Sequence, residues 1–204
     1  VKLLFATRST GKQREIRRMV EPAGHEVLFP DEAGVPESPE EHRLEVADSF
    51  ETNARLKAEY FVAKTGLPTV ADDSGLEVLS LGGQPGTRSK RWANANGTPD
   101  AVDLANNREL LRRLAGAKEH RRRARYRCVL VLLRSTGAFP EMFEGSCNGA
   151  ILEAPRGTGG FGYDPLFLAD ELGKTFGEAD SAEKDRVSHR GRALAALLVA
   201  LASG

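Results

Sequence analysis

Short apolar runs alternate with helical patterns along the first part of the chain. Residues 3–6, 26–29 and 69–71 are the brief, continuous apolar runs typical of buried strands. Apolar side chains instead recur at helical spacing at Ile16, Met19 and Val20, and again within a helix expected from Ser49 to about Thr65. The order strand, helix, strand, helix, strand favours an α/β sheet with crossover connections. Further along, Thr98 and Pro99 predict the start of another helix, with Leu104, Leu111 and Leu114 on its apolar face. We therefore expect a single domain spanning residues 1–204.

Charge and hydropathy exclude several classes of partner. Lysine plus arginine balance aspartate plus glutamate at 29 each, so no overall field attracts nucleic acid or a membrane surface. The most apolar run, residues 193–202, is shorter than the ~20 residues that a membrane helix needs. The first residues lack the pattern of a signal peptide. Cys128 and Cys147 lie in strand-like runs and are expected to be reduced core residues, although a disulfide stays open. We expect a cytoplasmic protein.

Two adjacent carboxylates stand at the centre of the run Thr69–Val78. Asp72, Asp73, Ser74 and Gly75 separate two β-prone halves, and such residues favour turns. We expect a hairpin or a kinked strand with both acids at its tip. On a strand, neighbouring side chains point to opposite faces, so one acid can reach a site while the other braces it. Paired carboxylates suit a divalent cation or acid–base chemistry, and a solvated turn is the alternative.

A polar loop joins the first strand to the first helix. Residues 7–11 contain small polar side chains and Gly11, and Ser9 or Thr10 is placed to cap the helix. The free backbone N–H groups at such a helix start favour an anion, and Lys12 lies at its mouth. The pattern is not a P-loop, because the first glycine is missing and Gln13 replaces the hydroxyl residue. The segment is a candidate phosphate site.

Three further segments admit both a functional and a structural interpretation. One of the many acids in residues 30–48 is a candidate metal ligand, but their spacing does not select it. Residues 81–92 combine cations with Trp92 and are either an anion contact or an exposed basic loop. The arginine-rich run 120–127 leads into a strongly apolar strand, so we interpret it as the solvated start of that strand rather than a nucleic-acid contact.

A glycine-rich loop lies at residues 156–167. Its glycines allow the backbone to approach a ligand closely. Phe161 and Tyr163 can stack on a planar ring, and Asp164 can accept a hydrogen bond from the edge of that ring. Packing glycines and core aromatic residues are the alternative interpretation.

The last helix begins close to a basic pair. Ser188 is a natural cap, and His189 and Arg190 fall in the first helical turn. Cations there oppose the helix dipole, which favours a phosphate or an electron-rich oxygen nearby. The helix that follows is apolar nearly all round, so it is buried or lies at a subunit contact.

Taken together, these motifs resemble the inosine/xanthosine triphosphate pyrophosphatases, which hydrolyse non-canonical purine nucleoside triphosphates. The most specific parts are Ala71–Leu76, Gly157–Pro165 and Ser188–Gly191, in that order, and the resemblance covers essentially the whole chain. It implies a long, mixed, twisted sheet flanked by helices, with two lobes and the active site in the cleft between them.

The resemblance also implies a role for each matching residue. Asp73 is the metal ligand and general base, Asp72 supports it, and Glu45 is a second metal ligand, with Mg²⁺ as the cofactor. The substrate-binding set is Thr7, Arg8, Ser9, Thr10, Gly11 and Lys12 at the triphosphate, Ser74, the base-reading residues Phe161, Gly162, Tyr163 and Asp164, and Lys184, His189 and Arg190, which close the site. The family is commonly dimeric, so a homodimer is expected.

Three positions depart from the family pattern. Ser9 replaces an asparagine over the phosphates, Thr52 replaces a glutamate before Asn53, and Lys90 stands where alanine is common. The expected reaction is hydrolysis of ITP, dITP or XTP to the monophosphate and pyrophosphate, which cleanses the nucleotide pool. The alternatives are a related pyrophosphatase for another modified base, and a non-enzymatic protein that binds nucleotides or RNA.

Overall fold

The computed structural model describes residues 1–203, which fall into two compact units. Among the described residues, the first unit comprises residues 1–73, 128–145 and 190–203, and the second comprises residues 74–127 and 146–189. The boundaries fall inside β-strands and after the first residue of the last helix, so each unit is assembled from segments that are distant in the sequence.

A mixed sheet of seven strands forms the framework. Its order is β2-β1-β3-β4-β5-β6-β7. The strands are β1 (Lys2–Phe5), β2 (Glu26–Leu28), β3 (Thr69–Val78), β4 (Arg123–Leu133), β5 (Glu141–Ile151), β6 (Phe167–Ala169) and β7 (Lys174–Thr175). Strand β1 is parallel to β2 and β3, whereas β6 is antiparallel to both β5 and β7. The expected α/β architecture with a mixed sheet and flanking helices is confirmed.

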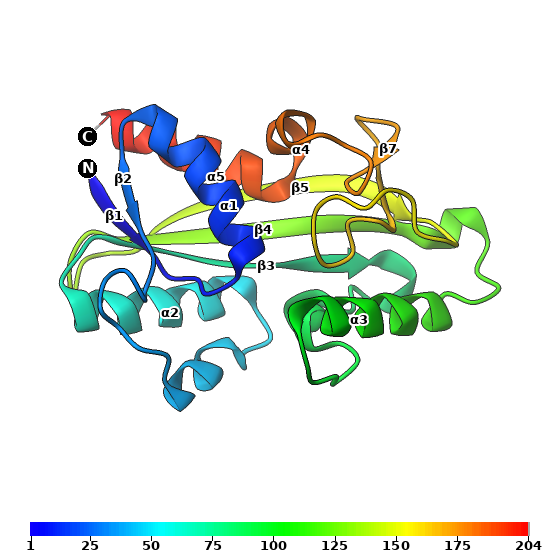
Figure 1. The fold of residues 1–204 in the computed structure, drawn as a ribbon, viewed down its shortest axis with the longest axis horizontal. Coiled ribbons are helices and arrows are strands. Elements are labelled where there is room, and N and C mark those ends of the chain that lie inside the picture. Colours follow the sequence, from blue (N-terminus) through cyan, green and yellow to red (C-terminus); the bar gives the residue numbers. More distant parts are fainter. Residues whose placement is uncertain (204) are drawn as a thin grey trace. The chain divides into compact units, whose positions relative to one another are not determined.

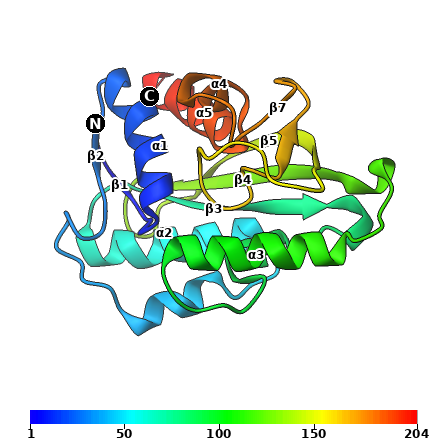
Figure 2. The same ribbon diagram turned by 45° about the vertical axis from the view of Figure 1, so that its right-hand side comes forward.

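Within the described residues, five α-helices accompany the sheet. They are α1 (Thr10–Val20), α2 (Phe50–Thr65), α3 (Pro99–Arg113), α4 (Ser181–Val187) and α5 (His189–Ser203), with short 3₁₀ turns η1 (Glu21–Ala23), η2 (Pro39–Glu45), η3 (Leu79–Leu81), η4 (Gly86–Arg91) and η5 (Glu119–Arg122). In the first unit, α1 and α5 cover one face of the strands and α2 covers the other (Figure 1). In the second unit, α3 lies on one face and α4 on the other (Figure 2).

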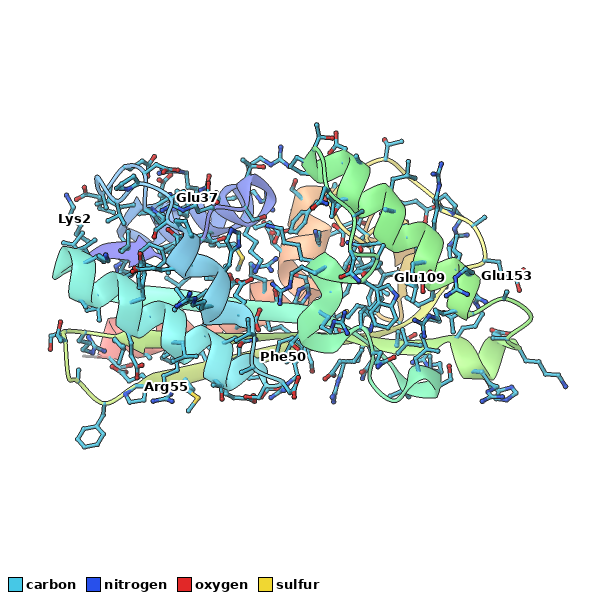
Figure 3. The ribbon with its side chains drawn as sticks, turned by 90° about the horizontal axis from the view of Figure 1, so that it is seen from below. Lys2, Glu37, Phe50, Arg55, Glu109 and Glu153 are labelled. Atoms are coloured by element: carbon cyan, nitrogen blue, oxygen red, sulfur yellow. The ribbon has the colours of Figure 1, made fainter. Side chains whose placement is uncertain are left out.

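Side-chain caps explain where several helices begin. The Ser49 hydroxyl accepts a hydrogen bond from the Thr52 amide. Ser49 directly precedes Phe50, the first residue of α2, which is labelled in Figure 3. Thr98 caps α3 in the same way, followed by a proline at the first helical position. Helix α4 begins with a capping box between Asp180 and Glu183. The predicted starts of α2 and α3 are confirmed, whereas α4 was not predicted.

Each unit has its own hydrophobic core. The first unit contains two clusters, one built on Leu3, Phe5, Val70 and Leu194 and the other on Leu4, Ala54, Phe61 and Ala71. Alternate residues of β1 and β3 thus face opposite clusters, as the period of a strand requires. The cluster of the second unit includes Leu76, Leu110, Tyr126, Phe167 and Phe176.

Strand β3 corrects one expectation. The run Thr69–Val78 is a single ten-residue strand rather than a hairpin, and Asp72 and Asp73 are buried in its middle instead of exposed at a tip. Turn-prone residues are accommodated in a strand here because partners from helices in the same unit satisfy both carboxylates. The alternative of a solvated turn is wrong for the same reason.

Smaller differences concern the second unit, the cysteines and membrane spans. Leu104 was expected on the apolar face of α3 but is exposed, whereas Leu110 and Leu114 are buried. Both cysteines are buried free thiols, as expected. Within residues 1–203 no helix is long and apolar enough to cross a membrane.

Candidate active site

Strand β3 turns its two adjacent carboxylates to opposite faces of the first unit. Asp72 accepts a hydrogen bond from Lys12 Nζ of α1 at 3.0 Å and contacts the Arg190 guanidinium of α5 at 3.2 and 3.3 Å. Asp73 accepts a hydrogen bond from Asn53 Nδ2 of α2 at 2.8 Å. The division of partners follows the helices on the two faces (Figure 1).

Arg190 is the centre of a buried ionic network. Besides Asp72, its guanidinium contacts Glu15 of α1 at 2.6 Å, and both glutamate and arginine are buried. Burial alone would raise the pKa of Asp72, but the cations Lys12, Arg190 and Lys57 hold it well below its ordinary value. Burial would likewise lower the pKa of Arg190, but Glu15 and Asp72 raise it. Both groups are therefore ionised at neutral pH.

Lys57 forms a second link on the α2 face. Its ammonium donates to Glu45 Oε1 at 2.7 Å and to the main-chain carbonyl of Asp72. Burial alone would lower the pKa of Lys57, yet Glu45, Asp73 and Asp72 raise it above its ordinary value. Burial raises the pKa of Asp73, an effect that Lys57 and Lys12 partly offset. Glu45 and Asp73 thus both stabilise the positive charge of Lys57.

The donor set suits a magnesium ion only in part. Within residues 1–203, no group of three histidine, cysteine, aspartate or glutamate residues is arranged to hold a metal. Mg²⁺ is commonly bound by one or two carboxylates together with waters and substrate phosphates. Two neighbouring carboxylates, Glu45 and Asp73, meet that lower requirement. The residues present therefore fit a metal that arrives with a polyphosphate.

The predicted phosphate segment does form the start of α1. Ser9 occupies the N-cap position but makes no side-chain cap hydrogen bond. Gln13 folds back so that its amide donates to the Thr7 carbonyl at 3.1 Å. The first-turn N–H groups of a helix are natural anion donors, and Lys12 in this turn adds a cation. The local structure agrees with a phosphate site.

Arg8 has other partners in the same unit. Its guanidinium binds Glu41 at 2.8 and 2.9 Å, Asp31 at 2.5 Å and the Val35 carbonyl at 3.0 Å. These contacts tie the start of α1 to the segment between β2 and α2. The arrangement indicates a role for Arg8 in holding this segment in place.

In the second unit, the glycine-rich loop is tied to α4. Lys184 Nζ donates to Asp164 Oδ2 at 2.5 Å, and the same oxygen accepts from the Phe161 amide at 2.9 Å. The Lys184 ammonium also lies 4.8 Å from the centre of the Phe161 ring. Asp164 thus fixes both the loop backbone and the lysine. Asp164 is almost completely buried, so its carboxylate stabilises the loop rather than facing a ligand.

Two aromatic positions belong to the core of the second unit. Tyr163 is 3 % exposed, and its hydroxyl donates to the Ser89 carbonyl at 2.7 Å. The expected stacking of Tyr163 on a ligand is therefore not available in this structure, because the core occupies its ring. His189 stacks on Tyr126 with ring centres 4.5 Å apart. Phe161, which is only partly buried, is the aromatic side chain that remains for a ligand.

The arginine-rich segment is largely engaged within the second unit. Arg122 is buried and donates to the carbonyls of Leu114, Ile151 and Leu152. Arg123 pairs with Asp170 and Arg125 pairs with Glu77. These contacts support the structural interpretation of this run over nucleic-acid binding, with Arg122 more buried than expected.

The structure divides the predicted site residues between the two units. The first unit holds Thr7, Arg8, Ser9, Thr10, Gly11, Lys12, Glu45, Asp72, Asp73 and Arg190, and the second holds Ser74, Phe161, Gly162, Tyr163, Asp164, Lys184 and His189. Sequence reasoning missed Glu15 and Lys57 as members of the charged network. The signal was available for Lys57, a lysine among the apolar residues on one face of α2.

The sequence pattern of the Ham1 family matches residues 3–200. The chain belongs to the Ham1 family. A Ham1-family relative, the dITP/XTP pyrophosphatase of Thermus thermophilus, is 46% identical over 204 residues, covering 100% of this chain and 93% of that protein. The dITP/XTP pyrophosphatase of Thioalkalivibrio sulfidiphilus is 45% identical and covers 97% of each chain.

Solved structures of the Ham1 family agree with the fold. The HAM1 protein of Coxiella burnetii superposes with a TM-score of 0.86 at 32% identity, covering 100% of both chains. A nucleoside-triphosphatase or dITP/XTP pyrophosphatase of Mycobacterium abscessus has a TM-score of 0.73 at 40% identity, covering 97% of this chain and 99% of that one. The family resemblance inferred from three sequence motifs is confirmed.

Proposed function

We propose that this Ham1-family chain hydrolyses the non-canonical purine nucleoside triphosphates ITP, dITP and XTP to the monophosphate and pyrophosphate, and so cleanses the nucleotide pool. The observation that carries the proposal is the full-length similarity to dITP/XTP pyrophosphatases at 45–46% identity. The charged network around Asp72 and Asp73 supplies groups suited to this chemistry.

The first unit is suited to the triphosphate. The start of α1 offers backbone N–H groups, and Lys12 offers a cation that can stabilise charge on phosphate oxygens. Both carboxylate oxygens of Asp72 accept hydrogen bonds, one from Lys12 and the other from Arg190, which suits a residue that supports Asp73. Asp73 lies on the other face beside Asn53 and is the residue that we assign to orienting and deprotonating the attacking water.

Glu45 and Asp73 are the residues that we propose to hold Mg²⁺. Held there, Mg²⁺ would supply positive charge that offsets the negative charge developing on the phosphates during phosphoryl transfer. Lys57 already donates to Glu45, and its charge partly offsets the burial that raises the pKa of Asp73. Lys57 therefore favours the charged form of Asp73 that a metal would bind.

The second unit is suited to recognition of the base. Phe161 offers a ring for stacking, and Lys184 beside it offers a hydrogen-bond donor for a 6-oxo group. A donor at that position favours hypoxanthine and xanthine over adenine, because the adenine amino group would leave the donor unpaired.

Product analysis tests the proposed function. ITP, dITP, XTP, GTP and ATP are incubated with the purified chain, with and without Mg²⁺, and released pyrophosphate and orthophosphate are measured separately. We expect pyrophosphate from the first three nucleotides only, and only with Mg²⁺. Orthophosphate alone, or no product, would contradict the reaction. Equal turnover of ITP and a modified pyrimidine triphosphate would instead favour a related pyrophosphatase with another base preference.

We also propose that the chain acts as a cytoplasmic homodimer. The exposed stripe of α5, formed by Ala195, Ala196, Val199 and Ala202, is apolar and is compatible with a subunit contact. The two free, buried thiols agree with a reducing compartment.

A further inference from the structure

We propose that Asp103 and Asn107 of α3 are positioning residues that hold the base-reading loop Phe161–Asp164 in its working shape. The inference rests on the proposed function and assigns a role to two residues outside the motifs that carry the family resemblance. It is based on a pair of hydrogen bonds that bind a single residue of the loop from both sides.

Both side chains reach the backbone of Gly162. Asp103 Oδ2 accepts a hydrogen bond from the Gly162 amide at 2.6 Å, and Asn107 Nδ2 donates to the Gly162 carbonyl at 2.9 Å. Asp103 and Asn107 are four residues apart, so they lie on one face of α3. One helix face therefore clamps the donor and the acceptor of one loop residue.

The loop needs such an external anchor. Gly162 has a φ of +64°, and Gly160 has a φ of +74°, conformations that cost glycine little and fix nothing by themselves. A methyl group built at Gly162 would meet no atom within 4 Å, so the loop is not held there by tight packing. At Gly162 itself, hydrogen bonds rather than packing therefore define the position of the backbone.

The second anchor of the loop is a contact within the loop itself, made by Asp164. Asp164 accepts from the Phe161 amide and binds Lys184, whose ammonium lies over the Phe161 ring. Gly162 is the residue between this internal contact and the buried Tyr163. If Gly162 is released, the Asp164 contact still holds the Phe161 backbone, but the orientation of the Phe161 ring relative to Lys184 is less restricted.

The chemistry of the two side chains indicates that the clamp is their main task. Burial raises the pKa of Asp103, and the Gly162 N–H group partly offsets that effect. Asn107 Oδ1 is buried and has no hydrogen-bond partner among the described residues. An amide that satisfies only its donor side is held in place by that donor contact, which here goes to Gly162.

Matched variants test the proposal. Asp103→Ala removes the acceptor, whereas Asp103→Asn keeps a neutral acceptor of the same shape. Asn107→Asp removes the donor without changing side-chain volume. We expect Asp103→Ala and Asn107→Asp to raise KM for ITP about tenfold, with kcat changed less than about threefold. Asp103→Asn is expected to stay within about threefold of the wild type in both constants.

Two readouts separate positioning from general damage to the fold. Inhibition by inorganic tripolyphosphate, which has no base, should be unchanged in all three variants. Hydrogen exchange of the segment 157–167 should become about tenfold faster in Asp103→Ala and Asn107→Asp, and this measurement needs no activity. An unchanged exchange rate, or equal losses of ITP and tripolyphosphate affinity, would overturn the inference. Wild-type protein that fails to hydrolyse ITP would contradict the proposed function, while exchange would still decide the role of the clamp.

Discussion

At the scale of single residues, the two acids of β3 differ through their partners. Asp72 is surrounded by the cations Lys12 and Arg190 on one face, and Asp73 lies beside Asn53 and within reach of the charge on Lys57 on the other. Neighbouring positions in a strand thereby acquire separate sets of partners. The geometry supports the proposed division into a supporting carboxylate and a reactive one.

The reactive carboxylate can be tested by an isosteric change. Asp73→Asn keeps the shape and can still bond Asn53, but it removes the proposed base and a proposed metal ligand. We expect pyrophosphate release from ITP to fall at least about 100-fold, the scale of a lost general base. Asp170→Asn, on an exposed ion pair with Arg123, is the matched control and should retain activity. Retained activity in Asp73→Asn would remove Asp73 from the catalytic role.

The buried pair of Glu15 and Arg190 predicts a large stability effect. Glu15→Gln removes one of the two carboxylates that compensate the buried Arg190 guanidinium, and the other, Asp72, is shared with Lys12. We expect the free energy of unfolding in urea to fall by about 3–5 kcal/mol. Glu32→Gln breaks the half-exposed pair with Arg17 and should cost at most about 1 kcal/mol. Similar losses in both variants would contradict the importance of burial.

Cys128 predicts a dependence of stability on alkaline pH. Burial raises the pKa of its thiol to about 12, with a smaller contribution from Asp72. In the unfolded chain a thiol ionises near pH 8.5, so the stability that the protonated thiol contributes is complete below that pH. It is lost as the pH rises from about 8.5 toward about 12, by up to about 1.4 kcal/mol per pH unit.

Comparison with Cys128→Ala isolates this effect from other titrating groups. Urea unfolding of both proteins is measured between pH 7 and pH 10. The stability of the wild type relative to the variant should be constant up to about pH 8 and then decline. A difference that stays constant to pH 10 would show that the folded thiol ionises as easily as the unfolded one.

At the scale of elements, β3 and η4 approach each other too closely for any side chain at Gly75. A methyl group there would lie 2.2 Å from the Gly86 carbonyl oxygen and 2.6 Å from the Ser89 hydroxyl. Ser89 accepts from the Leu76 amide at 2.9 Å and donates to the Gly86 carbonyl at 2.6 Å. One serine hydroxyl thus joins the strand to the turn, and glycine leaves it room.

Gly75→Ala is therefore expected to destabilise the protein. Overpacking against a backbone oxygen costs about 1–3 kcal/mol or more, and the Ser89 hydrogen bonds would be displaced as well. Gly24→Ala is the control, because its methyl group would meet no atom and only its positive φ costs about 1 kcal/mol. Thermal unfolding of the two variants compares these effects. Equal shifts in Tm would contradict the close approach.

At the scale of the whole molecule, periodicity predicted the fold class and most helix boundaries. The predicted helices 49–65 and the one starting at Pro99 are present because their caps are local in sequence. A hairpin or a kinked strand with Asp72 and Asp73 at its tip was expected, and the exposed tip is wrong. Turn propensity is local, whereas the partners Lys12, Arg190 and Asn53 are distant in sequence. Propensity is overridden where distant partners satisfy polar groups.

The candidate site was predictable in its motifs and less so in its supporting residues. Lys57 was missed although the sequence carries a signal for it, a charge among the apolar residues on one face of α2. Glu15, Asp103 and Asn107 carry no local signal of their roles. Their partners are Arg190 and Gly162, far along the chain. Only the folded structure brings these pairs together.

The oligomeric state is a prediction for the assembled protein. We expect sedimentation equilibrium to give twice the mass of one chain. Val199→Glu would place a charge in the exposed apolar stripe of α5 and should shift the mass toward that of one chain, whereas Glu59→Gln on an exposed part of α2 should not. A wild-type mass of one chain would contradict the homodimer, and an unchanged mass in Val199→Glu would place the contact elsewhere.

The pair formed by Lys12 and Asp72 has a consequence for anion selectivity. The ammonium of Lys12 is already paired with the carboxylate of Asp72. A phosphate that binds Lys12 must therefore compete with Asp72 for this ammonium. A small anion with one contact gains little from such an exchange. A polyphosphate that also engages the first turn of α1 and a metal gains through several linked contacts. The internal counterion therefore acts as a filter against the chloride and orthophosphate that surround any nucleotide enzyme.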